Sequence, residues 1–357
     1  MAMCLLLCLT ACGDDNQSQQ PGQSKPQGNA AETPTDKFTT YSFDYFDTQT
    51  IITGYAENQA AFDTVANQVL KQLGEYHRLY DIYKRYDGLE NLCTINDVVD
   101  GAHRTVTVDQ RIIDMLLYAR EMHDKTDGMV NVAMGSVLKI WHDYRTVGMS
   151  DPADASLPPM DKLQAAAQHT DITKMVIDDN ANTVTLTDPQ MRLDVGAIAK
   201  GYATEQVAKW LEKYGVSGWL LNVGGNVRAV GAKPGGSPWV AGLENPQDTA
   251  ADYLAYLNLA HEALVTSGSY QRFYIVNGKS YHHIIHPDTL MPAEGYLSVS
   301  IICPDSGMGD ALSTALFCMS IEEGKRLLSS MKGVAASWVT ADGKQTVSDG
   351  WNKYVKK

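Results

Sequence analysis

The sequence has few cysteines and few basic residues, and both shortages exclude classes of protein. Six cysteines occur in 357 residues, and beyond residue 12 only Cys93, Cys303 and Cys318 remain, with no C-x-x-C spacing. Such a set indicates neither a disulfide framework nor a zinc site. Lysine and arginine number 29 against 42 acidic residues, which gives a net charge of −13 at pH 7. This balance argues against a nucleic-acid partner, and an anionic ligand would need local help from a metal ion or a helix terminus.

The N-terminal apolar stretch is short and lacks the basic residues of a typical signal peptide. Residues 1–12 read MAMCLLLCLTAC, too few to span a bilayer as a helix, and no lysine or arginine precedes the apolar run. Leu9 to Cys12 nevertheless resembles a bacterial lipobox, whose cysteine becomes the lipidated first residue. We expect a lipoprotein signal over 1–12 that ends at Cys12, and hence an exported protein on the extracytoplasmic side of the bacterial cell membrane. The alternative is a disordered hydrophobic N-terminus.

Apolar residues are almost absent from residues 13–37, which are rich in Gln, Ser, Pro, Gly and Asp. Such a segment buries too little surface to offset the entropy of ordering it, so we predict a disordered linker. About 320 residues remain, enough for a sizeable core, and no second linker of this composition interrupts them. We therefore predict one folded domain over 38–357.

Helical and strand-like patterns alternate in this domain without a regular βαβ repeat. Alternation at 41–56 predicts a strand, and apolar positions at helical spacing predict a helix over 57–77. A helix over 109–128 has Asp109 as its N-cap candidate and Gly128 as its stop, and a hairpin is predicted at 175–188.

Apolar runs then predict several strands before a last helical pattern that begins near Ser306. The runs lie at 217–231, 237–243, 262–268, 271–276, 281–285 and 296–303. Together these elements predict an α+β fold, a single large domain of mixed sheets with packed helices.

Asp310, Ser313 and Thr314 place oxygen atoms on one face of the last predicted helix, because they are three and four residues apart. An oxygen-only cluster suits a hard cation such as Mg²⁺, which also takes phosphate and water ligands. The alternative is helix capping, with Asp310 as the N-cap, and the spacing alone favours it.

Asp194 and Lys200 flank small residues at the start of a predicted helix, in LDVGAIAKGYA (193–203). Helix N-termini offer unpaired N–H groups and a positive dipole end, which suit a phosphate. Lys200 follows Ala199 and precedes Gly201, so this is not a Walker loop. The alternative is a capped helix with Lys200 as a solvated surface charge.

Two further stretches have a purely structural interpretation that is the stronger one. The adjacent glycines of NVGGN (222–226) suit the close approach of a flat ligand, or a β-bulge. The segment YHHIIH (281–286) does not match a zinc motif, and His282 and His283 would point to opposite faces of a strand. A single histidine acting as a base is more plausible than a metal cage, while His282 and His286 are expected to be structural or at the surface.

Six stretches stand out in order along the chain: DGMVNVAMGSVLKIW (127–141), DVGAIAKGYA (194–203), NVGGN (222–226), TSGSY (266–270), HIIHPDT (283–289) and DALSTAL (310–316). Taken together, they closely resemble one family, the ApbE family of FAD:protein FMN transferases. The resemblance runs from about Asp44 to Met331. It implies an α/β domain that binds FAD with Mg²⁺ and moves FMN onto a Thr or Ser hydroxyl of a target flavoprotein, releasing AMP. Many members are exported lipoproteins.

The resemblance also implies roles for individual residues. Mg²⁺ would be held by the Ala197 carbonyl, Asp310 and Thr314, with Ser313 adjacent. His283 would be the base or positioning group for the attacking hydroxyl, and Asp310 would share the catalytic role. FAD contacts would fall on Phe46, Tyr83, Met129, Val130, Asn131, Asp194, Lys200 and Ile285.

Three residues depart from the family's pattern. Asn131 stands where many members have Asp, His286 replaces the Asp of the usual turn, and Leu290 replaces its Gly. We expect Asn131 to keep hydrogen bonds to the flavin nucleotide, and His286 to affect activity more than binding. Two other functions stay open, namely hydrolysis of FAD to FMN and AMP, and a non-enzymatic FAD-binding lipoprotein.

Overall fold

The computed structural model describes residues 35–99, 101–247 and 252–357. The predicted signal, Cys12 and the linker up to residue 34 lie outside these residues. The first strand begins at Asp36, so the last two residues of the predicted linker belong to the fold. Among the helices of the described ranges, none has both the length and the apolar character needed to cross a bilayer.

The centre of the fold is an eight-stranded sheet with the order β1-β2-β8-β9-β12-β15-β16-β17. Each neighbouring pair in it is antiparallel. Because side chains alternate across a strand, Leu221 of β8 faces one apolar cluster while Leu220 faces another. The strands are β1 (Asp36–Ser42), β2 (Thr50–Ala56), β8 (Trp219–Val223), β9 (Asn226–Val230), β12 (Ala263–Gly268), β15 (Tyr296–Cys303), β16 (Ala335–Thr340) and β17 (Gln345–Val347).

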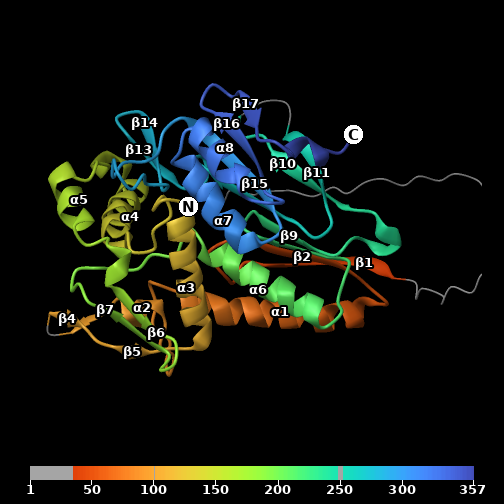
Figure 1. The fold of residues 1–357 in the computed structure, drawn as a ribbon, viewed down its shortest axis with the longest axis horizontal. Coiled ribbons are helices and arrows are strands. Elements are labelled where there is room, and N and C mark those ends of the chain that lie inside the picture. Colours follow the sequence, from red (N-terminus) through yellow and green to blue (C-terminus); the bar gives the residue numbers. More distant parts are fainter. Residues whose placement is uncertain (1–34, 100, 248–251) are drawn as a thin grey trace, which may run out of the picture.

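Helices cover one face of this sheet, and Figure 1 shows α1, α6 and α7 lying across it. In α1 the Asn58 side chain accepts the Ala61 N–H as N-cap, and Phe62 stacks on Trp219 of β8 at 5.0 Å. The helices are α1 (Gln59–Tyr80), α2 (Leu92–Ile95), α3 (Gln110–Lys125), α4 (Gly135–Ser150), α5 (Met160–Ala167), α6 (Ala199–Lys213), α7 (Ser306–Phe317) and α8 (Ile321–Ser329).

Small sheets complete the fold. The pair β10 and β11 covers the second face of the main sheet, where Trp239 and Leu257 pack against Leu220 and Trp351. A third cluster joins α4, α5 and β13 through Trp141, Leu163 and Tyr274. The strands are β3 (Val98–Val99), β4 (Ala102–His103), β5 (Val106–Thr107), β6 (Met175–Asp178), β7 (Thr183–Leu186), β10 (Trp239–Glu244), β11 (Tyr253–Leu259), β13 (Phe273–Val276) and β14 (Lys279–His282), and short 3-10 turns lie at 152–154, 172–174, 234–236 and 351–353.

The α+β class and most predicted elements are confirmed. The hairpin at 175–188 is β6–β7, and Asp109 caps α3 by accepting the Arg111 N–H. The single strand predicted over 41–56 is wrong, because β1 and β2 form a hairpin around residues 43–49. Two of those loop residues have positive φ, which a strand cannot accommodate.

The β-bulge interpretation of NVGGN is also wrong. Gly224 and Gly225 have φ of 57° and 89° and form the two-residue turn between β8 and β9. Two positive φ angles are what a type I′ hairpin turn requires.

Candidate active site

The first turn of α6 meets the second turn of α7 at Gly201. The Gly201 N–H donates to Asp310 Oδ2 at 2.8 Å. A Cβ on Gly201 would lie 2.3 Å from the Ser306 carbonyl oxygen and 2.5 Å from Asp310 Cβ, so only glycine permits this approach. The start of α6 has no side-chain cap, so no capping side chain offsets the positive dipole end that the Asp310 carboxylate meets.

Asp310 is not the N-cap of α7, so the capping interpretation is wrong. The N-cap is Asp305, whose side chain accepts the Met308 N–H at 3.0 Å. Asp310 lies in the next turn and is 4% exposed. A buried carboxylate that does not cap its own helix needs partners elsewhere, and it finds them on α6.

Lys200 is one of those partners rather than a free surface charge. Its Nζ lies 3.4 Å from Asp310 Oδ1, and its side chain is 24% exposed. The predicted pairing of the two motifs is therefore confirmed in space, although 110 residues separate them in sequence. A lysine, a carboxylate and a helix N-terminus are groups of the kind that bind phosphates and cations, and here they meet at one place.

The groups predicted to bind Mg²⁺ have the donor chemistry that this ion prefers. Within the described ranges, no group of three or more His, Cys, Asp or Glu side chains could hold a metal. The predicted ligands are hard oxygen donors, namely the Asp310 carboxylate, the Thr314 hydroxyl and the Ala197 carbonyl. Proteins commonly bind Mg²⁺ through one or two carboxylates, with substrate phosphates and water as the other ligands. Ser313 is less available, because it donates to the Asp310 carbonyl at 3.0 Å and lies 2.8 Å from Ser267 Oγ.

A second polar group surrounds Asp194, just before α6. Asp194 Oδ1 accepts the Gly196 N–H at 2.9 Å, and burial raises the pKa of its carboxyl group while His142 and Arg145 oppose the shift. The sequence motifs missed His142 and Arg145, because both lie on α4 at positions that no motif singles out. Burial and the neighbouring Arg272 lower the pKa of Arg145, which marks two cations held close together.

His283 is held as a neutral imidazole. Its Nδ1 lies 3.2 Å from the Arg272 carbonyl, which can only accept, so Nδ1 carries the proton and Nε2 is left as the acceptor. Burial, Arg272 and Arg145 lower the pKa of His283 to about 3. The neutral ring leaves Nε2 able to position a hydroxyl group and to take its proton as a weak base, since a pKa of about 3 is far below neutral.

The turn after His283 contains two of the residues that depart from the family pattern, His286 and Leu290. His286 Nδ1 accepts the Asp288 N–H at 3.1 Å, as an aspartate side chain would in an Asx turn. Leu290 has φ of 59°, a left-handed conformation that glycine adopts without steric cost. Its carbonyl accepts the Trp141 indole N–H at 2.8 Å. His282 is structural, as expected, since its ring bonds the Ala293 carbonyl at 2.8 Å.

The other predicted FAD contacts lie on four separate segments. Asn131 donates to the Thr170 carbonyl at 2.8 Å and accepts from Ala133 N–H at 2.9 Å, so both ends of its amide are engaged within the protein. The Tyr83 ring packs at a tilt against the His142 ring, with centroids 5.1 Å apart and an interplanar angle of 37°. Their contact with FAD stays a prediction, as it does for the others: Phe46 and Met129 are partly buried, and Val130 and Ile285 are buried.

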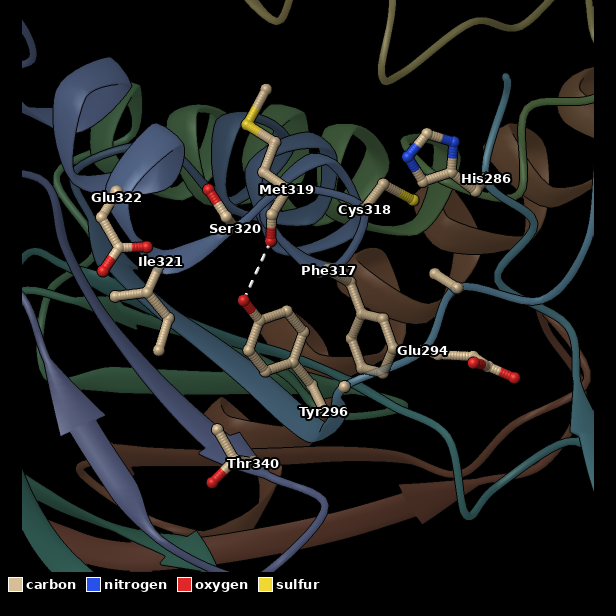
Figure 2. A pocket seen from close by; sticks show the side chains of 12 residues that line it. His286, Glu294, Tyr296, Phe317, Cys318, Met319, Ser320, Ile321, Glu322 and Thr340 are labelled. Atoms are coloured by element: carbon tan, nitrogen blue, oxygen red, sulfur yellow. Dashed lines mark hydrogen bonds between the residues drawn. The ribbon is translucent and has the colours of Figure 1, made fainter. Parts of the chain in front are cut away.

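A cavity of about 410 Å³ adjoins this site without containing its predicted residues. Figure 2 shows it at the end of α7, with Phe317 and Tyr296 side by side and the Tyr296 hydroxyl bonded to the Met319 carbonyl at 3.0 Å. Since Phe317 is three residues beyond Thr314, the cavity begins about one helical turn past the predicted cation ligands.

Comparison with known proteins shows the family of this chain. The sequence model of the ApbE family matches residues 39–338. An FAD:protein FMN transferase of Klebsiella pneumoniae (strain 342) is 32% identical over 273 residues, which cover 74% of this chain and 81% of that protein. Another, from Treponema pallidum (strain Nichols), is 32% identical over 259 residues, 69% of this chain and 70% of its own length.

Among solved structures, the ApbE protein of Thermotoga maritima superposes with a TM-score of 0.77 at 26% identity, covering 90% of this chain and all of that one. Similarity in sequence and in fold thus extends over the whole region that contains Lys200, His283 and Asp310. The chain belongs to the ApbE family.

Proposed function

We propose that this protein transfers the FMN moiety of FAD to a Thr or Ser hydroxyl of a target flavoprotein and releases AMP. The observation that carries the proposal is the meeting of Lys200, Asp310 and the uncapped start of α6, which together suit a pyrophosphate and its cation. The curated relatives at 32% identity bear the name of this activity.

The residues account for the chemistry of this transfer. The acceptor hydroxyl oxygen forms a bond to the phosphorus of the FMN half, and the bond between that phosphorus and the AMP oxygen breaks. His283 Nε2 takes the hydroxyl proton, and the Lys200 ammonium offsets the negative charge of the pyrophosphate. Bound Mg²⁺, held by Asp310, Thr314 and the Ala197 carbonyl, would supply further charge neutralisation.

We also propose that the protein is exported and anchored in the cell membrane through a lipidated Cys12. The lipobox-like sequence Leu9 to Cys12 and the polar segment after it support this placement. The acceptor would then be an electron-transfer flavoprotein exposed on the same side of the membrane.

The transfer is tested by incubating the purified protein with FAD, Mg²⁺ and a candidate acceptor, and measuring the acceptor's intact mass. We expect an FMN adduct that needs Mg²⁺ and is absent with Asp310→Ala. Free FMN and AMP, with no adduct on any acceptor, would show that the protein hydrolyses FAD and does not transfer FMN. FAD left intact and bound would make the protein a flavin-binding lipoprotein.

A further inference from the structure

The loop between β1 and β2 adopts an unfavourable backbone conformation at the predicted flavin site. Phe46 and Asp47 are consecutive, and their φ angles are 56° and 49°. Residues with a Cβ rarely adopt this left-handed region, and two in succession without glycine persist only where the surroundings hold them. Such conformations cluster at ligand sites.

His77 of α1 makes the contact that holds Phe46. The Phe46 N–H donates to His77 Nδ1 at 3.2 Å. The two rings meet edge to face, with centroids 5.5 Å apart and an interplanar angle of 78°. The Tyr45 ring also lies near the same imidazole, with centroids 6.1 Å apart. One side chain thus supports the backbone and the aromatic ring of Phe46 together.

The loop packs directly against the backbone of two glycines. This close packing leaves the loop little space in which to move. A Cβ on Gly74 would lie 2.8 Å from Tyr45 Cε1, and a Cβ on Gly224 would lie 2.4 Å from Thr48 Oγ1. Asp47 is near enough to act electrostatically on Tyr83, another predicted FAD contact. The loop is therefore fixed between α1 and the β8–β9 turn, beside the candidate site.

We propose that His77 is a positioning residue for FAD binding, which keeps Phe46 in its left-handed conformation with the ring set for the flavin. This inference rests on the proposed function, because it assumes that FAD is the ligand. His77 acts through Phe46 and takes no part in the transfer itself. It therefore governs FAD affinity and KM, and kcat at saturating FAD stays unchanged.

Two substitutions separate the hydrogen bond from simple packing. His77→Leu keeps an apolar side chain but removes the acceptor, whereas His77→Asn places a carbonyl oxygen near the position of Nδ1. By calorimetric titration with FAD and Mg²⁺, we expect about tenfold weaker binding with Leu and nearly normal binding with Asn. Lys71→Ala, an exposed position on the same helix, is the matched control and should bind as the unchanged protein does.

A second pair tests the backbone conformation directly. In the His77→Leu background, Asp47→Gly should restore part of the FAD affinity, because glycine adopts positive φ without steric cost. Asp47→Ala removes the same charge but keeps the strain, so it should restore nothing. Equal effects of Gly and Ala, wild-type affinity in His77→Leu, or an Asn variant as weak as Leu would each overturn the proposal.

A readout without FAD keeps this inference distinct from the proposed function. Chymotrypsin cleaves after aromatic residues, and we expect faster cleavage at Phe43, Tyr45 and Phe46 in His77→Leu than in His77→Asn. Equal rates would overturn the holding role of His77. Binding of FAD without any transfer would overturn the transferase and leave this inference standing.

Discussion

At the scale of single residues, the candidate site depends on a helix contact that tolerates no side chain. The virtual Cβ of Gly201 would lie 2.3 Å from the Ser306 carbonyl oxygen, which belongs to the backbone and cannot swing away. The same approach brings the Gly201 N–H to Asp310 Oδ2 at 2.8 Å. The packing of the two helices and the placement of the Asp310 carboxylate therefore both depend on Gly201.

Gly201→Ala should lower both stability and ligand binding. Forcing α6 away from α7 should cost about 1–3 kcal/mol of unfolding free energy, and moving Asp310 should weaken Mg²⁺ binding. Urea unfolding and Mg²⁺ titration would measure the two effects. Gly215→Ala is the control, since its φ of 71° is strained but nothing lies within 4 Å, so only stability should fall. Unchanged Mg²⁺ binding in Gly201→Ala would contradict the coupling.

Two lysines of α6 offer a matched comparison of charge. Lys200 lies 3.4 Å from Asp310, whereas Lys209 pairs with Asp305 at 3.0 Å and is 51% exposed. Lys200→Met should weaken FAD binding by about tenfold or more, because a partly buried charged hydrogen bond to phosphate is lost. Lys209→Met should change FAD affinity little, as expected of an exposed ion pair. Similar losses in both would show that net charge alone matters.

The sequence predicted the residues of this site that carry recognisable motifs, and missed those that do not. Lys200 and Asp310 stand in compact motifs whose chemistry can be recognised without knowing the fold. His142 and Arg145 lie on α4 among ordinary helix residues, and the fold alone brings them to Asp194. Arg272 acts on His283 through a backbone carbonyl, which no side-chain pattern can reveal.

At the scale of elements, turns and loops were harder to predict than helices and strands. The alternating pattern of residues 41–56 runs on through the loop between the two strands. Phe46 and Asp47 adopt positive φ in this loop, and no glycine in the loop sequence marks the break. The adjacent glycines at 224 and 225 do mark a turn, but only the pairing of Val223 with Asn226 distinguishes it from a bulge. The local sequence does not reveal which residues pair across the turn.

The β8–β9 turn yields a prediction that runs against turn statistics. Asn-Gly is the preferred pair for a type I′ turn, so Gly224→Asn would be expected to stabilise the hairpin. Instead it should destabilise the protein by about 1–3 kcal/mol, because the new Cβ would lie 2.4 Å from Thr48 Oγ1. Gly225→Asn, with nothing within 4 Å, should cost less.

Thermal and urea unfolding of both variants would test this, and Thr48→Gly should relieve much of the cost of Gly224→Asn. A stabilised Gly224→Asn protein would show that the loop moves freely.

At the scale of the whole molecule, the fold class followed from the order of the elements, but the layering did not. Main-sheet strands such as β8 and β15 are buried on both faces, between helices on one side and β10–β11 on the other. Apolar residues such as Ile301 and Ile302 therefore follow one another and give no alternation from which a face could be assigned. Their partners become known only from the three-dimensional packing.

Two partly buried histidines should make the stability of the whole molecule depend on pH. Burial lowers the pKa of His282, although its bond to the Ala293 carbonyl and the nearby charge of Glu294 oppose the shift. The pKa of His283 is lowered as well. The unfolded chain thus binds these protons first as the pH falls below the ordinary histidine pKa of about 6.5. Stability is then fully present above that pH and is lost on acidification, by at most about 1.4 kcal/mol per pH unit for each histidine.

Urea unfolding at pH 7.5 and pH 5.5 would measure this dependence. His282→Gln should be less stable than the unchanged protein at pH 7.5, because the bonds to Ala293 and Ile284 are weakened. It should nevertheless lose less stability between the two pH values, since one of the titrating groups is gone. An equal loss in both proteins would mean that His282 takes up its proton without disturbing the fold.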